Sequence, residues 1–180
     1  MKPAYHACMD GIGWAGSAMA AARSRLEIAT QNLANTSSDG FRKLRAQGRL
    51  TESGVQIEAA RSFEQGGLRH TGRSDDLAII GAGAFVVRKS NGQVTETRNG
   101  AFVRDRFGRR CDDAGNRLVG MKLAPGSSVR SGFLESSDVN PISEMIDVLS
   151  AQRSFESAEK TLSSIDQTRQ KASNELARLK

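Results

Sequence analysis

Side chains that could act in catalysis are few in this sequence, and none belongs to a recognisable active-site motif. A serine or cysteine nucleophile needs a histidine base, and the 180-residue chain has two histidines, His6 and His70. Neither lies in a GxSxG nucleophile elbow. Cys8 and Cys111 are far apart, and neither belongs to a CxxC pair of the kind that binds zinc. We interpret them as two isolated thiols, with a disulfide between them as the alternative.

Two acidic pairs, Asp75-Asp76 and Asp112-Asp113, have side chains suited to acid–base or metal chemistry. Each pair adjoins a predicted turn, where aspartate is favoured because its carboxylate accepts local hydrogen bonds. No cluster of complementary ligands accompanies either pair in the sequence. We therefore predict that the protein is not an enzyme and binds no metal or other cofactor.

The net charge of +6 is spread thinly along the chain. Residues 1–50 carry 7 basic and 3 acidic groups, residues 51–130 carry 13 and 9, and residues 131–180 carry 6 and 8. A nucleic-acid-binding domain typically concentrates its basic residues on one face or segment, whereas here the C-terminal part is net acidic. We expect no nucleic-acid partner.

The sequence also lacks the patterns of membrane and secretory segments. No run of about 18 apolar residues is present, so we expect no membrane insertion. The N-terminus shows no charged segment followed by an apolar stretch and a small-residue cleavage site. On these grounds alone the protein would be placed in the cytoplasm.

A heptad stripe predicts a long helix near the N-terminus. Apolar residues recur at alternating spacings of three and four from Ile12 to Leu33, which is the pattern of a helix that packs against another helix. Several of these positions are alanine, so a partner helix can approach closely while little apolar area is buried. The members of this N-terminal seam are Ile12, Ala15, Met19, Ala22, Leu26, Ala29 and Leu33.

A second stripe predicts a helix that runs to the C-terminus. Asn140-Pro141 is a helix-start signal, because proline fits the first turn, where its missing amide hydrogen is not needed. The members of the C-terminal seam, which again alternate spacings of three and four, are Val148, Ala151, Phe155, Ala158, Leu162 and Ile165. The first turn of this helix, with Ile142, Met145 and Leu149, is offset from that register.

Between the two helices, short strand-like runs alternate with turn signals from about Val55 to Leu123. Asn91-Gly92 predicts a type I′ hairpin turn, and Asp105–Gly108 and Asp113–Asn116 predict further turns. Runs punctuated at such short intervals predict a small antiparallel β domain of about six strands.

These patterns together predict an α+β fold in which the N- and C-terminal helices pair as a coiled coil and a small antiparallel β domain lies between them. We place the N-terminal helix and the segment after it in residues 1–45, the β domain in residues 46–130 and the C-terminal helix in residues 131–180. The function that these patterns favour is that of a self-assembling structural subunit.

A run of residues after the first helix resembles a known family signature. The segment from Asn32 to Lys43, with Asn32, Leu33, Ala34 and Asn35 followed by Gly40 and Phe41, is similar to the N-terminal signature of bacterial flagellar basal-body rod and hook proteins. Further stretches resemble the same family in the same order: Phe63–Leu68, Asp76–Phe85, Thr97–Phe102, Gly132–Asn140 and Ala151–Glu156. The resemblance is nearest to the FlgF/FlgG type of rod protein, in a shortened form.

The resemblance implies a structural subunit of the flagellar rod, used in flagellum-dependent motility, that assembles helically through its terminal helices. Its implied partners are copies of itself, other rod or hook subunits and the flagellar export apparatus. The implied location is the basal body, as part of the periplasmic rod reached by type III export without a cleaved signal peptide. This implication replaces the cytoplasmic placement.

The sequence departs from the family pattern in one region above all. The link from Met121 to Arg130 is short where such proteins usually carry a second β domain. Proximal and distal rod positions therefore both stay open. The alternative from a different class is a soluble β-domain binding module whose helix pair forms a closed oligomer.

Overall fold

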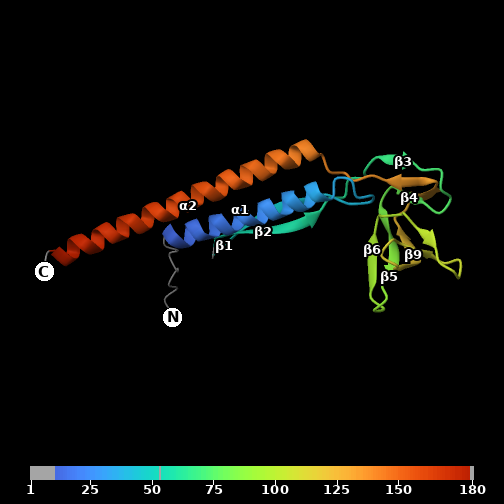
Figure 1. Ribbon diagram of the computed structural model, residues 1–180, viewed down its shortest axis with the longest axis horizontal. Helices are drawn as coiled ribbons and strands as arrows, with labels where there is room; N and C mark the ends of the chain where they lie inside the picture. The colour runs from blue at the N-terminus through green and yellow to red at the C-terminus, as the bar shows by residue number, and fades with distance from the viewer. Residues whose placement is uncertain (1–10, 53, 179–180) are drawn as a thin grey trace. The chain divides into compact units, whose positions relative to one another are not determined.

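The computed structural model of the protein describes residues 11–52 and 54–178. Helices α1 (Gly11–Ala34) and α2 (Pro141–Arg178) stand at the two ends of the described sequence, with strands between them (Figure 1). The strands are β1 (Leu44–Thr51), β2 (Gly54–Arg61), β3 (Leu68–His70), β4 (Leu77–Ile80), β5 (Gly83–Arg88), β6 (Val94–Thr97), β7 (Val103–Arg104), β8 (Arg110–Cys111), β9 (Arg117–Leu123), β10 (Ser128–Ser131) and β11 (Phe133–Glu135). The predicted α+β class is confirmed.

The chain forms two compact units. The first unit contains the described parts of Met1–Thr30, Arg45–Ala60 and Ile142–Lys180, and the second contains Gln31–Leu44 and Arg61–Pro141. Both helices belong mainly to the first unit, together with strands β1 and β2. The domain boundaries drawn from the sequence, after residues 45 and 130, stay predictions.

In the first unit, α1 and α2 lie side by side and antiparallel (Figure 1). Their facing residues are small: Ala15, Ala22 and Ala29 of α1 and Ala151 and Ala158 of α2 are buried. A side chain added at Gly11 would lie 3.2 Å from Cδ1 of Ile165, so the two helices approach closely at that end. Supercoiled packing of the pair stays a prediction.

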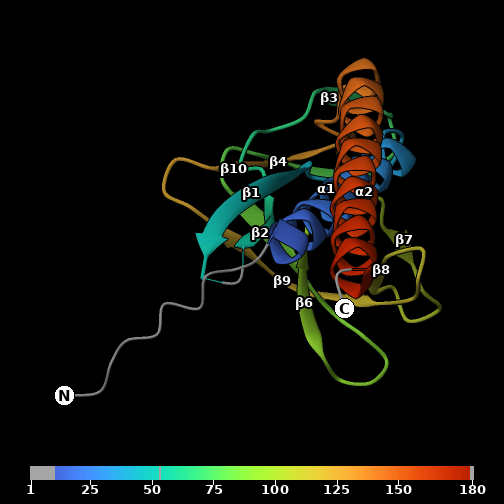
Figure 2. The same ribbon diagram turned by 90° about the vertical axis from the view of Figure 1, so that its left-hand side faces the viewer.

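Strands β1 and β2 form a two-stranded sheet beside α1 (Figures 1 and 2). Gly48 of β1 lies next to Ile57 of β2, since a Cβ at that glycine would make an ordinary van der Waals contact of 3.5 Å with Cδ1 of Ile57. Most side chains of β1 are exposed. The strand alternates apolar or small residues with polar ones, but two of its four apolar-face positions are Ala46 and Gly48, so the alternation is weak and this strand was not predicted.

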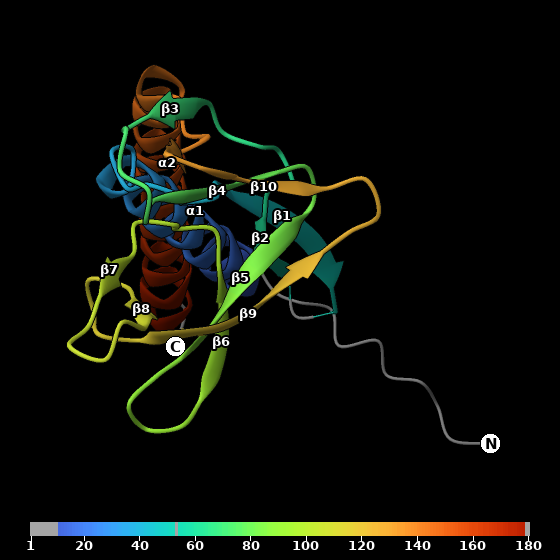
Figure 3. The same ribbon diagram turned by 90° about the vertical axis from the view of Figure 1, so that its right-hand side faces the viewer.

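The second unit has a small apolar core between three sheets. The strand order of the largest sheet is β6-β5-β9-β8-β7, and β10-β4 and β11-β3 form two-stranded sheets (Figure 3). The core contains Leu77, Ile79, Phe85, Val87 and Phe102. The rings of Phe85 and Phe102 meet edge to face with 5.3 Å between their centroids, a favourable geometry for aromatic pairs.

The prediction of about six strands was too low for the described residues, in which the strands β2 to β9 occupy the same stretch. Several of them are only two to four residues long. A strand of that length shows too few alternations to be separated from the turns beside it.

The turn at Asn91-Gly92 is a hairpin connection as predicted, but the type I′ assignment was wrong. That type needs positive φ at both central residues, and Asn91 does not have it, whereas Gly92 has φ 84°. The Gly92 amide donates to the Lys89 carbonyl, and the Lys89 amide donates to the Gln93 carbonyl. This is a three-residue loop whose last residue is a left-handed glycine. The turns after Asp105 and Asp112 repeat the same two hydrogen bonds, with Gly108 and Gly115 at positive φ.

Candidate functional site

The predicted assembly residues lie on covered faces of the two helices. In the N-terminal seam Ala15, Ala22 and Ala29 are buried, and in the C-terminal seam Ala151 and Ala158 are buried. The other members are half-buried, namely Ile12, Met19, Leu26, Leu33, Val148, Phe155, Leu162 and Ile165. Residues of both seams, among them Ala15, Ala158 and Ile165, line one groove between α1 and α2.

Large apolar side chains near the start of α2 are more than half exposed in the part of the chain that the structure describes. Ile142, Met145, Ile146 and Leu149 are 70%, 52%, 60% and 55% exposed. Their spacing of three and four residues places them on one side of the helix, and we call them the apolar stripe. The sequence showed Ile142, Met145 and Leu149 out of register with the C-terminal seam, and in the structure Ile146 and Leu149 also line the groove between α1 and α2.

The family-signature residues form a tight connection at the end of α1. Asn32 is buried, and its side-chain Nδ2 donates to the Leu44 carbonyl at 2.8 Å while its Oδ1 accepts from the Leu44 amide at 2.8 Å. One amide side chain therefore fixes the chain where it returns from the loop to begin β1. Aspartate lacks the donor and alanine lacks both groups, so this geometry is specific for asparagine.

Gly40 is required at its position for two reasons. Its φ of 69° is disfavoured for residues with a side chain, and a Cβ would lie 2.2 Å from the backbone nitrogen of Asn99. Its own amide donates to the Glu135 carbonyl at 2.6 Å. We call residues 35–43, between α1 and β1, the signature loop. Gly40 holds this loop against β11 and against the residue that follows the end of β6.

A buried ion pair lies directly behind this contact. Arg98 and Glu135 are 4% and 2% exposed, and Nε of Arg98 donates to Oε2 of Glu135 at 2.7 Å. The terminal nitrogens of Arg98 donate to the carbonyls of Gly83 at 3.1 Å and Ile79 at 3.2 Å. Oε1 of Glu135 accepts from the Gly66 amide at 3.2 Å. The pair is charge-compensated and joins four chain segments through one cluster.

Sequence reasoning did not foresee this pair. Arg98 lies in the family match Thr97–Phe102, and Glu135 lies in the match Gly132–Asn140, 37 positions further along the chain. A charged residue gives no periodic signal of its burial. The only available sign was the presence of both residues inside segments that resemble the same family.

The signature loop is held by further polar contacts within the second unit. The Lys43 amide donates to Oδ1 of Asp138 at 2.5 Å, and the Ser62 amide donates to the Lys43 carbonyl at 2.8 Å. Burial lowers the pKa of Arg42 and the charge of Arg98 lowers it further, while Glu135 and Asp138 act in the opposite direction. Arg42 therefore lies near a second arginine, Arg98, whose charge is already compensated by Glu135.

The residues considered for catalysis have structural surroundings. Asp112 accepts hydrogen bonds from the amide and the side chain of Asn116, which is the turn role expected for it. His70 packs edge to face on Phe133 with 4.9 Å between ring centroids. Cys111 is half-buried, while Cys8 and His6 lie outside the described residues.

Across residues 11–52 and 54–178, no three metal-binding side chains of histidine, cysteine, aspartate or glutamate come together. In the same ranges no helix has the length and apolar character to cross a membrane.

Two family descriptions match the ends of the chain. Residues 13–42 match "Flagella basal body rod protein", and residues 130–175 match "Flagellar basal body rod FlgEFG protein C-terminal". The first match contains most of α1 and of the signature loop, and the second contains most of α2.

Curated relatives agree with these matches. The chain is 32% identical over 142 residues to the flagellar hook protein FlgE of Rhizobium meliloti, covering 71% of this chain and 35% of the relative. It is 31% identical over 149 residues to the FlgE of Brucella abortus, covering 77% and 37%. It is 23% identical over 252 residues to the basal-body rod protein FlgG of Agrobacterium fabrum, covering 88% and 96%. The chain thus spans about a third of the length of the hook proteins it matches.

The matches at both ends of the chain define the class of protein, which is that of flagellar rod and hook proteins. The chain is a member of the flagellar rod and hook protein family. The alignment with FlgG is longer than the 180-residue chain, so that relative contains residues without a counterpart here.

Proposed function

We propose that the protein is a structural subunit of the bacterial flagellar basal body that assembles through its helical unit and performs no catalysis. The observation that carries the proposal is the apolar stripe on α2, in a chain whose two ends match rod-protein families. Burying a large apolar side chain contributes about 1.5–3 kcal/mol to the free energy of association. Burial of these four residues in a subunit contact would therefore favour association strongly.

In this proposal the two seams and the stripe have different tasks. The seam residues hold α1 and α2 together within one subunit, as a coiled-coil-like pair. The apolar stripe then contacts a neighbouring subunit, which is another copy or a related rod or hook protein. Because the seams are rich in alanine, the pair is only marginally stable by itself, and assembly adds stability.

We also propose that the working location is the periplasmic rod, and that the chain reaches it through the flagellar export apparatus without a cleaved signal peptide. Support comes from the family of the chain and from the names of its rod-protein relatives. A subunit with a small core and marginal helices suits export in an unfolded state followed by ordering on assembly.

The test is assembly of the full chain with Met145 replaced by aspartate, because Met145 belongs to the apolar stripe and does not line the groove between α1 and α2. M145D places a charge in the apolar stripe, and we expect loss of self-association in sedimentation and loss of motility in cells that carry the variant. The matched control is Gln167→Asp, at an exposed polar position further along the same helix, which should assemble normally. Motility retained by M145D would contradict the proposed contact. A closed dimer or trimer in place of open-ended assembly would favour the binding-module alternative.

A further inference from the structure

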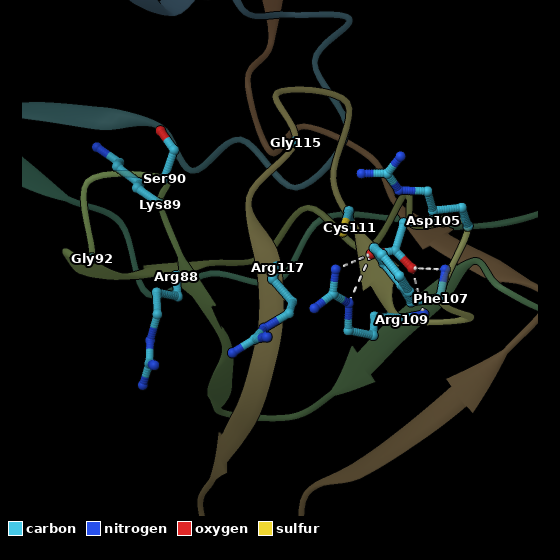
Figure 4. A pocket seen from close by; sticks show the side chains of 11 residues that line it. Arg88, Lys89, Ser90, Gly92, Asp105, Phe107, Arg109, Cys111, Gly115 and Arg117 are labelled. Atoms are coloured by element: carbon cyan, nitrogen blue, oxygen red, sulfur yellow. Dashed lines mark hydrogen bonds and ion pairs between the residues drawn. The ribbon is translucent and has the colours of Figure 1, made fainter.

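A concave basic surface lies where hairpin ends of the five-stranded sheet meet in the second unit. We call it the basic pocket, and Figure 4 shows its lining. Its charged residues are Arg88 of β5, Lys89 beside it, Arg106 and Arg109 of the β7–β8 turn, Arg117 of β9 and Asp105. The basic residues among them have no role in the sequence patterns described above or in the proposed assembly.

Two of these arginines face each other across neighbouring strands. Arg88 and Arg117 are direct partners in the antiparallel register of β5 and β9. Their side chains extend to the same side of the sheet in Figure 4. Like charges that stand directly opposite on an antiparallel pair are destabilising, so this arrangement costs stability unless a negative group lies between them.

The carboxylate that lines the pocket, that of Asp105, already forms an ion pair with Arg109. Oδ2 of Asp105 accepts from Nε of Arg109 at 2.8 Å, and its Oδ1 accepts from the amides of Phe107 at 2.8 Å and Arg109 at 2.9 Å. Desolvation raises the pKa of Asp105, but these hydrogen bonds and the charge of Arg109 outweigh it and hold that pKa below its ordinary value. Asp105 is therefore ionised at neutral pH and neutralises Arg109.

Four cations remain uncompensated around the pocket. Among the residues that the structure describes, no carboxylate forms an ion pair with Arg88, Lys89, Arg106 or Arg117. Arg106 instead stacks on Phe107, with 5.0 Å from its guanidinium carbon to the ring centroid. The neighbouring arginines of the same unit differ, since both Arg104 and Arg110 pair with Asp75.

We propose that the basic pocket binds a phosphate group between the guanidinium groups of Arg88 and Arg117. Planar guanidinium forks match phosphate oxygens in a bidentate way, and a dianion compensates both facing charges where a carboxylate compensates one. The phosphate is either a free ion or part of an anionic lipid headgroup. This inference does not rest on the proposed assembly, because it concerns the other unit of the chain.

The first test is calorimetric titration of the full chain with sodium phosphate at constant ionic strength. The double variant R88Q/R117Q should bind phosphate at least about tenfold more weakly, since charge-assisted hydrogen bonds are lost. The matched control R49Q/R61Q removes the same charge from two exposed positions outside the pocket and should bind like the wild type. Equal phosphate binding by the three proteins would overturn the proposal, and so would a wild type that binds neither phosphate here nor the anionic vesicles described below.

The second measurement is the midpoint of thermal unfolding at low salt, with and without phosphate. In chloride the single variant R88Q should unfold at the same temperature as the wild type or higher, because it removes the facing like charge. In phosphate the wild type should gain stability by ligand linkage, and R88Q should not. A midpoint lowered equally by R88Q in both buffers would show a packing role for Arg88 and would contradict the inference.

The third measurement separates the two sources of phosphate. The wild type is mixed with vesicles of phosphatidylglycerol and phosphatidylcholine, or of phosphatidylcholine alone, and bound protein is measured by co-flotation. Flotation with the anionic vesicles that R88Q/R117Q loses and R49Q/R61Q keeps identifies a lipid headgroup. Calorimetric binding without flotation identifies the free ion. Flotation that all three proteins share equally, without calorimetric binding, counts against the pocket.

Discussion

At the scale of single residues, the ion pair between Arg98 and Glu135 has the widest reach. It connects the ends of β4 and β5, the segment before β3 and, through the Glu135 backbone, Gly40 of the signature loop. Burying two charges is favourable only when their hydrogen-bonding capacity is satisfied, and here both groups have further backbone partners. The main effect of the ion pair is therefore to fix how these segments are arranged, rather than to add to the net free energy of unfolding.

Removing both partners of this pair should cost less stability than the sum of the costs of removing each one alone. We expect R98M or E135Q alone to lower the free energy of unfolding by about 3–5 kcal/mol, because each leaves an uncompensated buried charge or its partners unsatisfied. The double variant R98M/E135Q should lose less than the sum of the two. Urea denaturation of all four proteins in a double-mutant cycle measures the difference.

The control for this prediction is the exposed ion pair between Lys122 of β9 and Glu96 of β6 in the five-stranded sheet. K122M should change the free energy of unfolding by less than about 1 kcal/mol, since water screens that pair. Additive effects of R98M and E135Q would show that the buried residues act separately, contrary to the expectation.

At the scale of elements, the signature loop sets the path of the chain from α1 to β1. Asn32 closes the loop through both groups of its amide, and Gly40 lets the loop pass against Asn99 and Glu135. Asn32 and Gly40 of the family signature thus each have a role in the local geometry of a single subunit.

Gly40→Ala should destabilise the second unit more than the same change at another left-handed glycine. Positive φ alone costs alanine about 1–2 kcal/mol, and at Gly40 the close approach of the Asn99 backbone adds to it. Gly92→Ala is the matched control, because Gly92 has φ 84° with open space around it. Thermal unfolding of both variants gives the comparison, and equal losses would mean that the close approach to Asn99 is relieved at no cost.

The sequence predicted the helices well and the polar connections poorly. Alternating spacings of three and four located α1 almost to its ends, and Asn140-Pro141 marked the residue at which α2 begins. Strand β1 alternates apolar or small residues with polar ones, but Ala46 and Gly48 weaken that pattern and most of its side chains are exposed. The pairing of Arg98 with Glu135 depends on tertiary structure, which no local spacing encodes.

The same reasoning applies to the candidate sites. The two seams were found because burial repeats with the helical period. The basic pocket was not found, because Arg88 and Arg117 are distant in sequence and become neighbours only through the register of β5 and β9. The net charge of +6 indicated an excess of basic residues, but it did not indicate where on the folded protein these residues lie close together.

At the scale of the whole molecule, the two units differ in what stabilises them. The second unit has an aromatic and aliphatic core with Phe85 and Phe102 at its centre. The first unit relies on alanines between helices and on half-buried side chains such as Phe155. Because little apolar area is buried per turn, the first unit should unfold more easily than the second.

Replacing Phe155 by aspartate should therefore unfold the first unit and leave the second folded. Trp14, the one tryptophan of the chain, lies on α1, so its fluorescence reports on the first unit. We expect F155D to lose helical circular dichroism and the native Trp14 emission, while amide hydrogens of β4 and β5 keep their slow exchange. Gln152→Asp, at an exposed position on the same helix, is the control and should retain both signals. Loss of protection in β4 and β5 of F155D would mean that the two units fold as one, because the second unit would then depend on the helices for its stability.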